Sequence, residues 1–289
     1  MQQQRRVTPL EVLRYGIIIV ILLWIIFPLA WMFVTSFKPA DDIMTMPPKF
    51  IFQPTFDNYI HAVQKANFAL FIKNTVYCAV VSTVFVIVLS ALASYSFARY
   101  NPGEGNILFF ILTTKMFPAI AVVLPYFIIF RDIGNTTVGK LLGIGLDRPG
   151  ALIISYTIFN LPFAIWLMVS FFQDIPRELE DSARLDGYNR LQVLFRVALP
   201  LAAPGISVTA IFCLIFSWNE FLFAYILTRD VARTITVGVE SFFTLRGILW
   251  GPVSAAATIS VVPMLIFVLL LQRYMVRGLT WRSARLGLL

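Results

Sequence analysis

Six long apolar stretches constrain this chain more than any other feature of its sequence. A bilayer core is spanned by about 20 mostly apolar residues of α-helix, and six stretches approach or exceed that length: 17–34, 75–97, 107–130, 151–172, 205–228 and 251–271. Because 59% of the 289 residues are hydrophobic and only 13% are charged, the chain has more apolar surface than a soluble core can bury. The sequence therefore predicts an all-α, polytopic membrane protein with six transmembrane helices.

The order of these stretches predicts the organisation of the chain. The first is too long for the apolar region of a signal peptide and lacks a small-residue cleavage site after it, so we expect it to be retained. The predicted parts are a tail over 1–15, a first transmembrane helix over 16–37, an external loop over 38–73, a core of five further helices over 74–279, and a second tail over 280–289. Prolines and scattered aromatic residues in the external loop predict turns and short amphipathic pieces.

Arginines at the two ends of the chain predict its orientation. Three precede the first apolar stretch and four follow the last: Arg5, Arg6, Arg14, Arg273, Arg277, Arg282 and Arg285. Since basic residues beside membrane spans favour the cytoplasm, both tails should be cytoplasmic in the inner or plasma membrane of a bacterium or archaeon. The net charge of +8 is explained by such positions. Without a basic-aromatic module beside it, this charge predicts no nucleic-acid partner.

Residues typical of catalysis are sparse. Cys78 and Cys213 fall inside predicted spans, and His61 is the only histidine, with no nucleophile or metal partner arranged around it. Residues 134–141 fit a nucleotide-binding P-loop except that Leu141 replaces the Ser or Thr that would ligate magnesium. This segment also follows a membrane helix rather than a buried strand. We therefore expect no metal, cofactor, nucleotide or catalytic site in this chain.

One richly charged segment, 174–204, lies between two predicted spans, and the parity of the spans places it in the cytoplasm. Pro176 and the acidic residues after it predict a helix start. Gly187 interrupts the pattern, and Asn189, with a glutamine three residues later, predicts the cap of a second helix. That helix should stop before Pro200. The spacing alone is also typical of an amphipathic hairpin lying on the bilayer.

The order of residues in this segment favours a different interpretation. The run Glu-Asp-Ser-Ala-Arg-Leu-Asp-Gly at 180–187 resembles the cytoplasmic coupling motif of ABC-importer permeases, which is Glu-Ala-Ala, two residues, Asp-Gly, then an apolar helix ending in Pro. Asp181-Ser-Ala occupies the Glu-Ala-Ala positions, and Tyr188 replaces the usual small residue after Asp-Gly. The resemblance implies these ATPase-coupling residues: Glu180, Asp181, Ser182, Ala183, Asp186, Gly187, Phe195 and Pro200.

The resemblance covers roughly residues 74–279. It includes Leu-Pro-Phe-Ala-Ile-Trp at 161–166, Ser-Trp-Asn-Glu-Phe at 217–221 and Arg-Gly-Leu-Thr at 277–280. These are similar to the second permease subunit of binding-protein-dependent sugar importers of the maltose type. The resemblance implies the type I importer permease fold, a homologous second permease, two cytoplasmic ATPase subunits that bind ATP and magnesium, and an external substrate-binding protein. It also implies a chain that is not itself an enzyme and forms half of a sugar path.

Polar residues within the spans are candidates for that path, because they are rare in a membrane and often functional. At 1.5 Å per residue, Lys115 lies about 12 Å into the third stretch and Glu220 about 22 Å into the fifth. The candidates for the substrate path are Lys115, Asn160, Trp218, Asn219 and Glu220. Contacts between helices are the alternative role for each of them. A self-sufficient secondary transporter is the alternative for the chain, but the sequence lacks an internal repeat or a carboxylate cluster.

Overall fold

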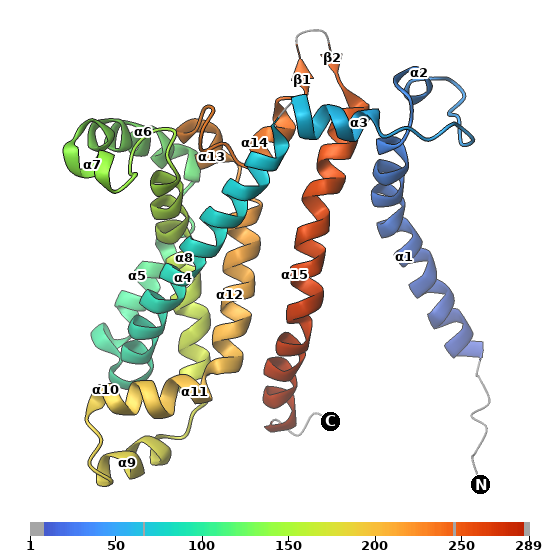
Figure 1. The fold of residues 1–289 in the computed structure, drawn as a ribbon. Helices are drawn as coiled ribbons and strands as arrows, with labels where there is room; N and C mark the ends of the chain where they lie inside the picture. The colour runs from blue at the N-terminus through green and yellow to red at the C-terminus, as the bar shows by residue number, and fades with distance from the viewer. Residues whose placement is uncertain (1–8, 66, 245–246, 286–289) are drawn as a thin grey trace. The chain divides into compact units, whose positions relative to one another are not determined.

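The computed structural model describes residues 9–65, 67–244 and 247–285 and is almost entirely helical (Figure 1). Two short strands, β1 (Phe243–Thr244) and β2 (Gly247–Ile248), form an antiparallel pair with Phe243 opposite Ile248. The chain divides into two compact units. One contains Met1–Phe68 and Val239–Val261, and the other contains Ala69–Gly238 and Val262–Leu289.

Within the described residues, four helices are long and apolar enough to cross a membrane: α1 (Pro9–Ser36), α4 (Phe68–Tyr100), α8 (Pro149–Gln173) and α15 (Trp250–Arg285). The number rises to six if each of two sharply bent helix pairs counts as one span. This architecture agrees with the predicted all-α membrane protein.

The third apolar stretch is a broken helix rather than a continuous one. It divides into α5 (Asn106–Thr114) and α6 (Ala119–Asn135), which are bent by 80° relative to each other. Pro118 sits before α6 with an extended backbone at ψ 122°. Proline has no N–H to continue the ladder and disfavours helical geometry in the residue before it, so the break falls there. The apolar stretch 107–130 therefore consists of two helices, and Lys115 lies at the break.

The fifth apolar stretch is broken as well. Helix α12 (Ala203–Trp218) ends at Asn219, and a separate helix, α13 (Leu222–Leu227), follows. The Glu220 carboxylate accepts hydrogen bonds from the Phe223 and Ala224 amides, at 2.9 and 3.2 Å, and so supplies acceptors for the first turn of α13. The depth estimated for Glu220 from a continuous helix therefore does not apply. Asn219 and Glu220 both lie in the break.

Helices α8, α12, α5 and α13 form the centre of the larger unit, where α8 packs against the other three. Figure 1 shows α9 and α10 at one end of α4, α8 and α12, with α6, α7 and α13 towards the opposite end. The core near α13 is built from buried residues of α4, α6, α8 and α13, which include Cys78, Val123, Phe130, Leu152, Tyr156, Phe223 and Leu227.

The shorter helices occupy the connections. They are α2 (Ala40–Ile43), α3 (Asp57–Ile60), the π turn η1 (His61–Lys65), the 3₁₀ turn η2 (Pro102–Gly105), α7 (Thr137–Leu141) and α14 (Ile235–Glu240). In the loop predicted to be external, Asn58 donates to the carbonyls of Ser36 and Lys38 at 3.0 and 2.8 Å. That loop therefore contains short helices, and the Asn58 side chain fixes α3 to the end of α1.

The P-loop-like segment has a packing role. A Cβ atom at Gly139 would collide with the carbonyl group of Ile133, so glycine allows α7 to approach the end of α6. The arginines used to predict orientation are only partly covered by the structure. Arg5 and Arg6, and the side chains of Arg273, Arg277, Arg282 and Arg285, lie outside the part of the chain that it describes.

Candidate functional site

The segment 174–204 folds as two helical pieces joined at a glycine. Helix α9 (Arg177–Leu185) is followed by α10 (Arg190–Val193), the π turn η3 (Leu194–Ala198) and α11 (Leu199–Leu201). The prediction that the second piece stops before Pro200 was wrong, because helical backbone continues to Leu201. The π turn before Pro200 shifts the backbone pairing, and proline needs no acceptor because it has no N–H.

Gly187 ends α9 in the left-handed conformation, at φ +91°. Its amide donates to the Arg184 carbonyl at 3.0 Å, and the Tyr188 amide donates to the Ala183 carbonyl at 3.1 Å. This pair of hydrogen bonds is a Schellman motif, in which glycine is the preferred residue. The predicted cap of the second helix is confirmed, because Asn189 and Gln192 exchange side-chain and backbone hydrogen bonds.

The two helical pieces have distinct buried and exposed faces. Ala183, Val193, Leu194 and Ala198 are buried, whereas Leu185 is 90% exposed. Leu191 and Phe195 are also exposed, at 64% and 58%. Six of the residues predicted to couple to an ATPase lie on exposed positions: Asp181, Ser182, Asp186, Gly187, Phe195 and Pro200. The exposed leucines and Phe195 give this segment an apolar surface around the glycine turn.

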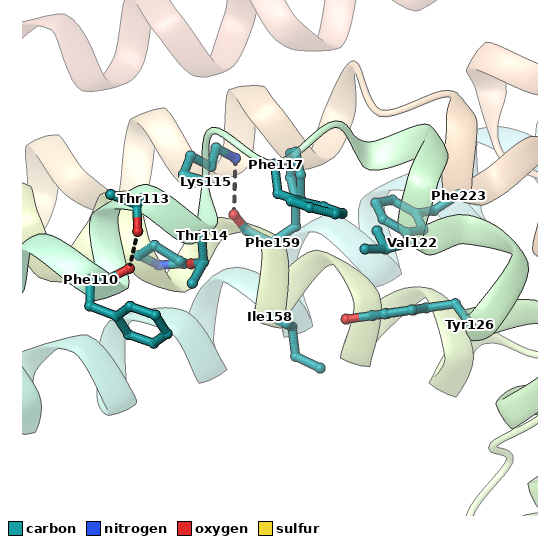
Figure 2. A pocket seen from close by; sticks show the side chains of 11 residues that line it. Phe110, Thr113, Thr114, Lys115, Phe117, Val122, Tyr126, Ile158, Phe159 and Phe223 are labelled. Atoms are coloured by element: carbon teal, nitrogen blue, oxygen red, sulfur yellow. Dashed lines mark hydrogen bonds between the residues drawn. The ribbon is translucent and has the colours of Figure 1, made fainter. Parts of the chain in front are cut away.

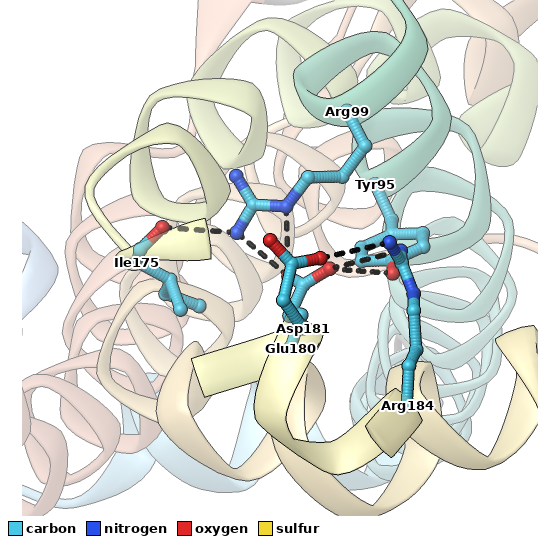
Figure 3. A network of polar contacts seen from close by, with 6 residues as sticks. All are labelled: Tyr95, Arg99, Ile175, Glu180, Asp181 and Arg184. Atoms are coloured by element: carbon cyan, nitrogen blue, oxygen red, sulfur yellow. Dashed lines mark hydrogen bonds and ion pairs between the residues drawn. The ribbon is translucent and has the colours of Figure 1, made fainter. Parts of the chain in front are cut away.

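Glu180 has a different setting from the other predicted coupling residues. Its side chain is 2% exposed and forms an ion pair with Arg99 of α4, whose side chain is 5% exposed (Figure 3). The Tyr95 hydroxyl donates to the same carboxylate at 2.9 Å, and Arg99 also donates to the Ile175 carbonyl at 3.0 Å. Glu180 therefore holds α9 against α4 instead of facing outward. Tyr95 and Arg99 were not among the predicted residues, although their spacing places both on one face of α4.

A cavity of about 480 Å³ lies where the two helix breaks meet α8. It is lined by four of the five predicted path residues, Lys115, Asn160, Asn219 and Glu220. Trp218 is the exception: its side chain is 4% exposed and does not line this cavity. The aromatic residues on the wall are instead Tyr156, Phe159, Phe216 and Phe221.

Lys115 belongs to a second cavity as well, of about 410 Å³, in the elbow between α5 and α6 (Figure 2). Its ammonium donates to the Phe159 carbonyl at 2.9 Å and lies 3.4 Å from the centre of the Phe159 ring. Within the described residues it forms no ion pair with a carboxylate. In the larger cavity, the residues that α8 contributes to the wall, Tyr156, Phe159 and Asn160, lie at helical spacing, a signal that the sequence already contained.

Two polar groups of the larger cavity have limited freedom. Asn160 donates to the Ser217 hydroxyl at 2.9 Å, and its buried Oδ1 has no hydrogen-bond partner among the described residues. Asn219 donates to the Ile215 carbonyl of its own helix. Together with Glu220 and Lys115, these side chains place donors and acceptors beside aromatic surfaces, a combination suited to a hydroxyl-rich solute.

At the opposite end of the unit from α9, Asp147 fixes the segment after α13. Burial raises the pKa of its carboxyl, but hydrogen bonds from the amides of Arg229, Ala232, Val231 and Asp230 outweigh burial and lower the pKa below the ordinary value of 3.8. A carboxylate that accepts this many amides is stabilised in its charged form. The backbone at 229–232 is thereby closed around one side chain.

Comparison with known proteins identifies the family. Residues 87–281 match the model of the binding-protein-dependent transport system inner membrane component. A probable ABC transporter permease, y4oR of Sinorhizobium fredii, is 37% identical and covers 90% of each chain. The trehalose/maltose transport system permease MalG of Thermococcus litoralis is 34% identical over 88% of this chain and 90% of its own. The sulfoquinovosyl glycerol transport system permease SmoH of Agrobacterium fabrum is also 34% identical, over 88% and 87%.

Solved structures show the same fold. A chain of a bacterial ABC transporter involved in the import of alginate superposes with a TM-score of 0.74 at 22% identity, covering 92% of this chain and 96% of its own. A chain from the alginate transporter in complex with a periplasmic protein bound to an alginate pentasaccharide gives 0.65 at 22% identity, covering 90% and 93%. The chain belongs to the family of inner-membrane permease components of binding-protein-dependent ABC transport systems, the multi-pass and non-catalytic subunits of these transporters.

Proposed function

We propose that this chain is one of two homologous permease subunits of an ATP-driven carbohydrate importer and forms half of its path. Two separate ATPase subunits, which bind ATP and magnesium, act on it from the cytoplasm, where both of its termini lie. An external binding protein delivers the solute. The observation that carries the proposal is the alignment of about nine tenths of the chain with permeases named for carbohydrate transport.

The coupling surface in this proposal is the apolar surface around Gly187, with Leu185, Leu191 and Phe195 meeting an ATPase subunit. These side chains are exposed on a segment whose backbone is closed by a Schellman motif and a capping box. A docking element of this kind passes on a movement only if it is internally stiff. Glu180 and Ala183 are buried, so their role is to hold α9 in position.

The path in this proposal runs through the cavity at the two helix breaks. Lys115 and Asn219 supply donors, and Glu220 and Asn160 supply acceptors, to the hydroxyl groups of a sugar. Broken helices free backbone and polar groups for a solute where a continuous helix would not. Closure of the ATPase dimer on ATP moves the docked segment, and the attached helices turn the cavity from one side of the membrane to the other.

Reconstitution into lipid vesicles tests the proposal. The chain assembled with its partner permease, ATPase subunits and ligand-loaded binding protein should accumulate trehalose or maltose, or the sugar that mass spectrometry identifies on the purified binding protein, only when ATP is present. The chain alone should neither hydrolyse ATP nor accumulate sugar. Accumulation driven by an ion gradient without ATPase would instead establish a secondary transporter.

A further inference from the structure

Helix α4 is tied at both of its ends to different segments of its own compact unit. It has 33 residues, and a rise of 1.5 Å per residue makes it about 50 Å long. It contains neither proline nor glycine, whereas α1, α8 and α15 contain Pro28, Pro162 and Pro263. Since sharp kinks fall mostly at proline or glycine, α4 is the stiffest of the four long helices that the structure describes.

The end of α4 nearest Tyr100 holds the coupling helix. Arg99 Nε donates to one Glu180 oxygen at 2.7 Å, and the Tyr95 hydroxyl donates to the other at 2.9 Å (Figure 3). The Arg99 guanidinium also reaches the Ile175 carbonyl, in the link between α8 and α9. Because both charged side chains are almost completely buried, rotating α9 away from α4 would leave the Arg99 guanidinium unpaired and leave Glu180 with only Arg184 of its own helix. Helix α9 and this end of α4 therefore move together.

The opposite end of α4 holds the segment 228–235. Asn74, 8% exposed, donates to the carbonyls of Val231 and Arg233 at 2.8 and 3.0 Å. The Thr75 hydroxyl accepts the Ile235 amide at 2.8 Å. These bonds link residues about 160 positions apart in the sequence, and the Asp147 carboxylate closes the same segment from the other side. Segment 228–235 and this end of α4 therefore move together.

We propose that α4 couples the orientation of α9 to that of segment 228–235, with Arg99 and Asn74 as positioning residues at its two ends. The inference rests on the proposed function, in which α9 meets the ATPase and the opposite face meets the binding protein. The two residues are 25 positions apart, about 37 Å along the helix. Coupling between two binding sites is reciprocal. Docking of the binding protein therefore alters the affinity of the ATPase subunits for ATP, and ATP binding alters the affinity for the binding protein.

The test measures how strongly the binding protein stimulates ATP hydrolysis by the assembled transporter. Arg99→Met and Asn74→Ala should each lower the stimulation at least about fivefold, with ATPase co-purification and basal hydrolysis unchanged. The matched controls are Arg131→Met, at an arginine whose side chain is 55% exposed, and Asn135→Ala, at the exposed end of α6. Both controls should keep wild-type stimulation.

The double variant decides between a coupling role and two local structural roles. Substitutions this far apart normally have additive free-energy effects. If α4 links the two ends, the double variant Arg99→Met/Asn74→Ala should lose no more stimulation of ATP hydrolysis than the more strongly impaired single variant. The inference would be overturned if the two losses of stimulation multiply in the double variant, or if either single variant keeps wild-type stimulation.

If a single variant does not assemble, Tyr95→Phe or Thr75→Val, each of which removes one hydrogen bond, takes its place in the same cycle. A wild-type complex that the binding protein does not stimulate would contradict the proposed function itself.

Discussion

The Asp147 carboxylate accepts hydrogen bonds from four consecutive backbone amides. Asp147→Asn keeps the size of the side chain but removes its charge and one of two acceptor oxygens, while four consecutive amides still point at it. We expect a loss of about 1 kcal/mol in the free energy of unfolding at pH 7, less than the roughly 1.5–3 kcal/mol typical of bonds to a charged group, because Asp147 is partly exposed. Thermal unfolding of the purified protein measures this loss. Asp132→Asn is the control, because that side chain is 60% exposed.

The same substitution predicts a pH dependence. Because the pKa of Asp147 is lower in the folded state than its ordinary value of 3.8, its stabilising contribution is fully present above that value. The contribution is lost as the pH falls through the lower, folded-state pKa. The stability difference between wild type and Asp147→Asn should therefore be largest near neutral pH and shrink below about pH 4. A difference that does not change with pH would contradict this assignment.

Glu220 combines a helix cap with a place on the cavity wall. Glu220→Ala removes the acceptor for the Phe223 and Ala224 amides. This change should lower the free energy of unfolding by about 1 kcal/mol and reduce the yield of assembled transporter. Glu220→Gln keeps an acceptor and should restore the yield. If the carboxylate serves the path, uptake per assembled complex stays reduced in the glutamine variant. Wild-type uptake by Glu220→Gln would show that only the cap is needed.

At the scale of elements, the glycine turn between α9 and α10 carries the sharpest prediction. A Cβ at Gly187 meets no atom within 4 Å, so Gly187→Val is costly only through its φ of +91°, by about 1–3 kcal/mol. We expect this variant to insert in the membrane and bind the binding protein but to lose the ATPase or its stimulation. Asp186→Ala should be milder. Gly187→Asn should recover part of the coupling, since asparagine is the best substitute in this conformation.

A matched glycine separates coupling from strain. Gly143 also has positive φ, at +65°, with no atom within 4 Å of the position that a Cβ would take, and it lies in a loop remote in sequence from α9. Gly143→Val should therefore strain the chain without releasing the ATPase. Co-purification of the ATPase with each variant is the measurement. Equal behaviour of the two valine variants, or wild-type retention by Gly187→Val, would return segment 174–204 to the amphipathic-hairpin interpretation.

For the whole molecule, the orientation in the membrane can be read by labelling. Cys78 and Cys213 are completely buried, so a membrane-impermeant maleimide should not reach them. Leu141→Cys and Leu185→Cys introduce thiols at positions that are 84% and 90% exposed. In intact cells expressing the chain without its ATPase, Leu141→Cys should react directly. Leu185→Cys should react only after the inner membrane is permeabilised, and the opposite pattern would reverse the predicted orientation.

Features that depend on one segment at a time could be predicted from the amino-acid sequence. The length of an apolar stretch against the thickness of a bilayer is a property of that stretch, so the all-α membrane fold followed from composition. The turn at Gly187 and the cap at Asn189 were predictable for the same reason, because their hydrogen bonds span at most five residues. The family resemblance rested on such local patterns and was confirmed by the comparisons.

Contacts between side chains that are distant in the sequence became visible in the folded structure alone. Arg99 and Glu180 are 81 residues apart, and Asn74 and Arg233 are 159 apart, so neither pair leaves a periodic signal in the sequence. The same holds for the cavity, which no single motif predicts because it forms where the α5–α6 and α12–α13 breaks lie beside α8. Trp218 is buried, which its local sequence did not predict, because burial depends on how helix faces pack. Local hydrogen bonding sets the elements, but the packing of their faces determines which polar groups share a site.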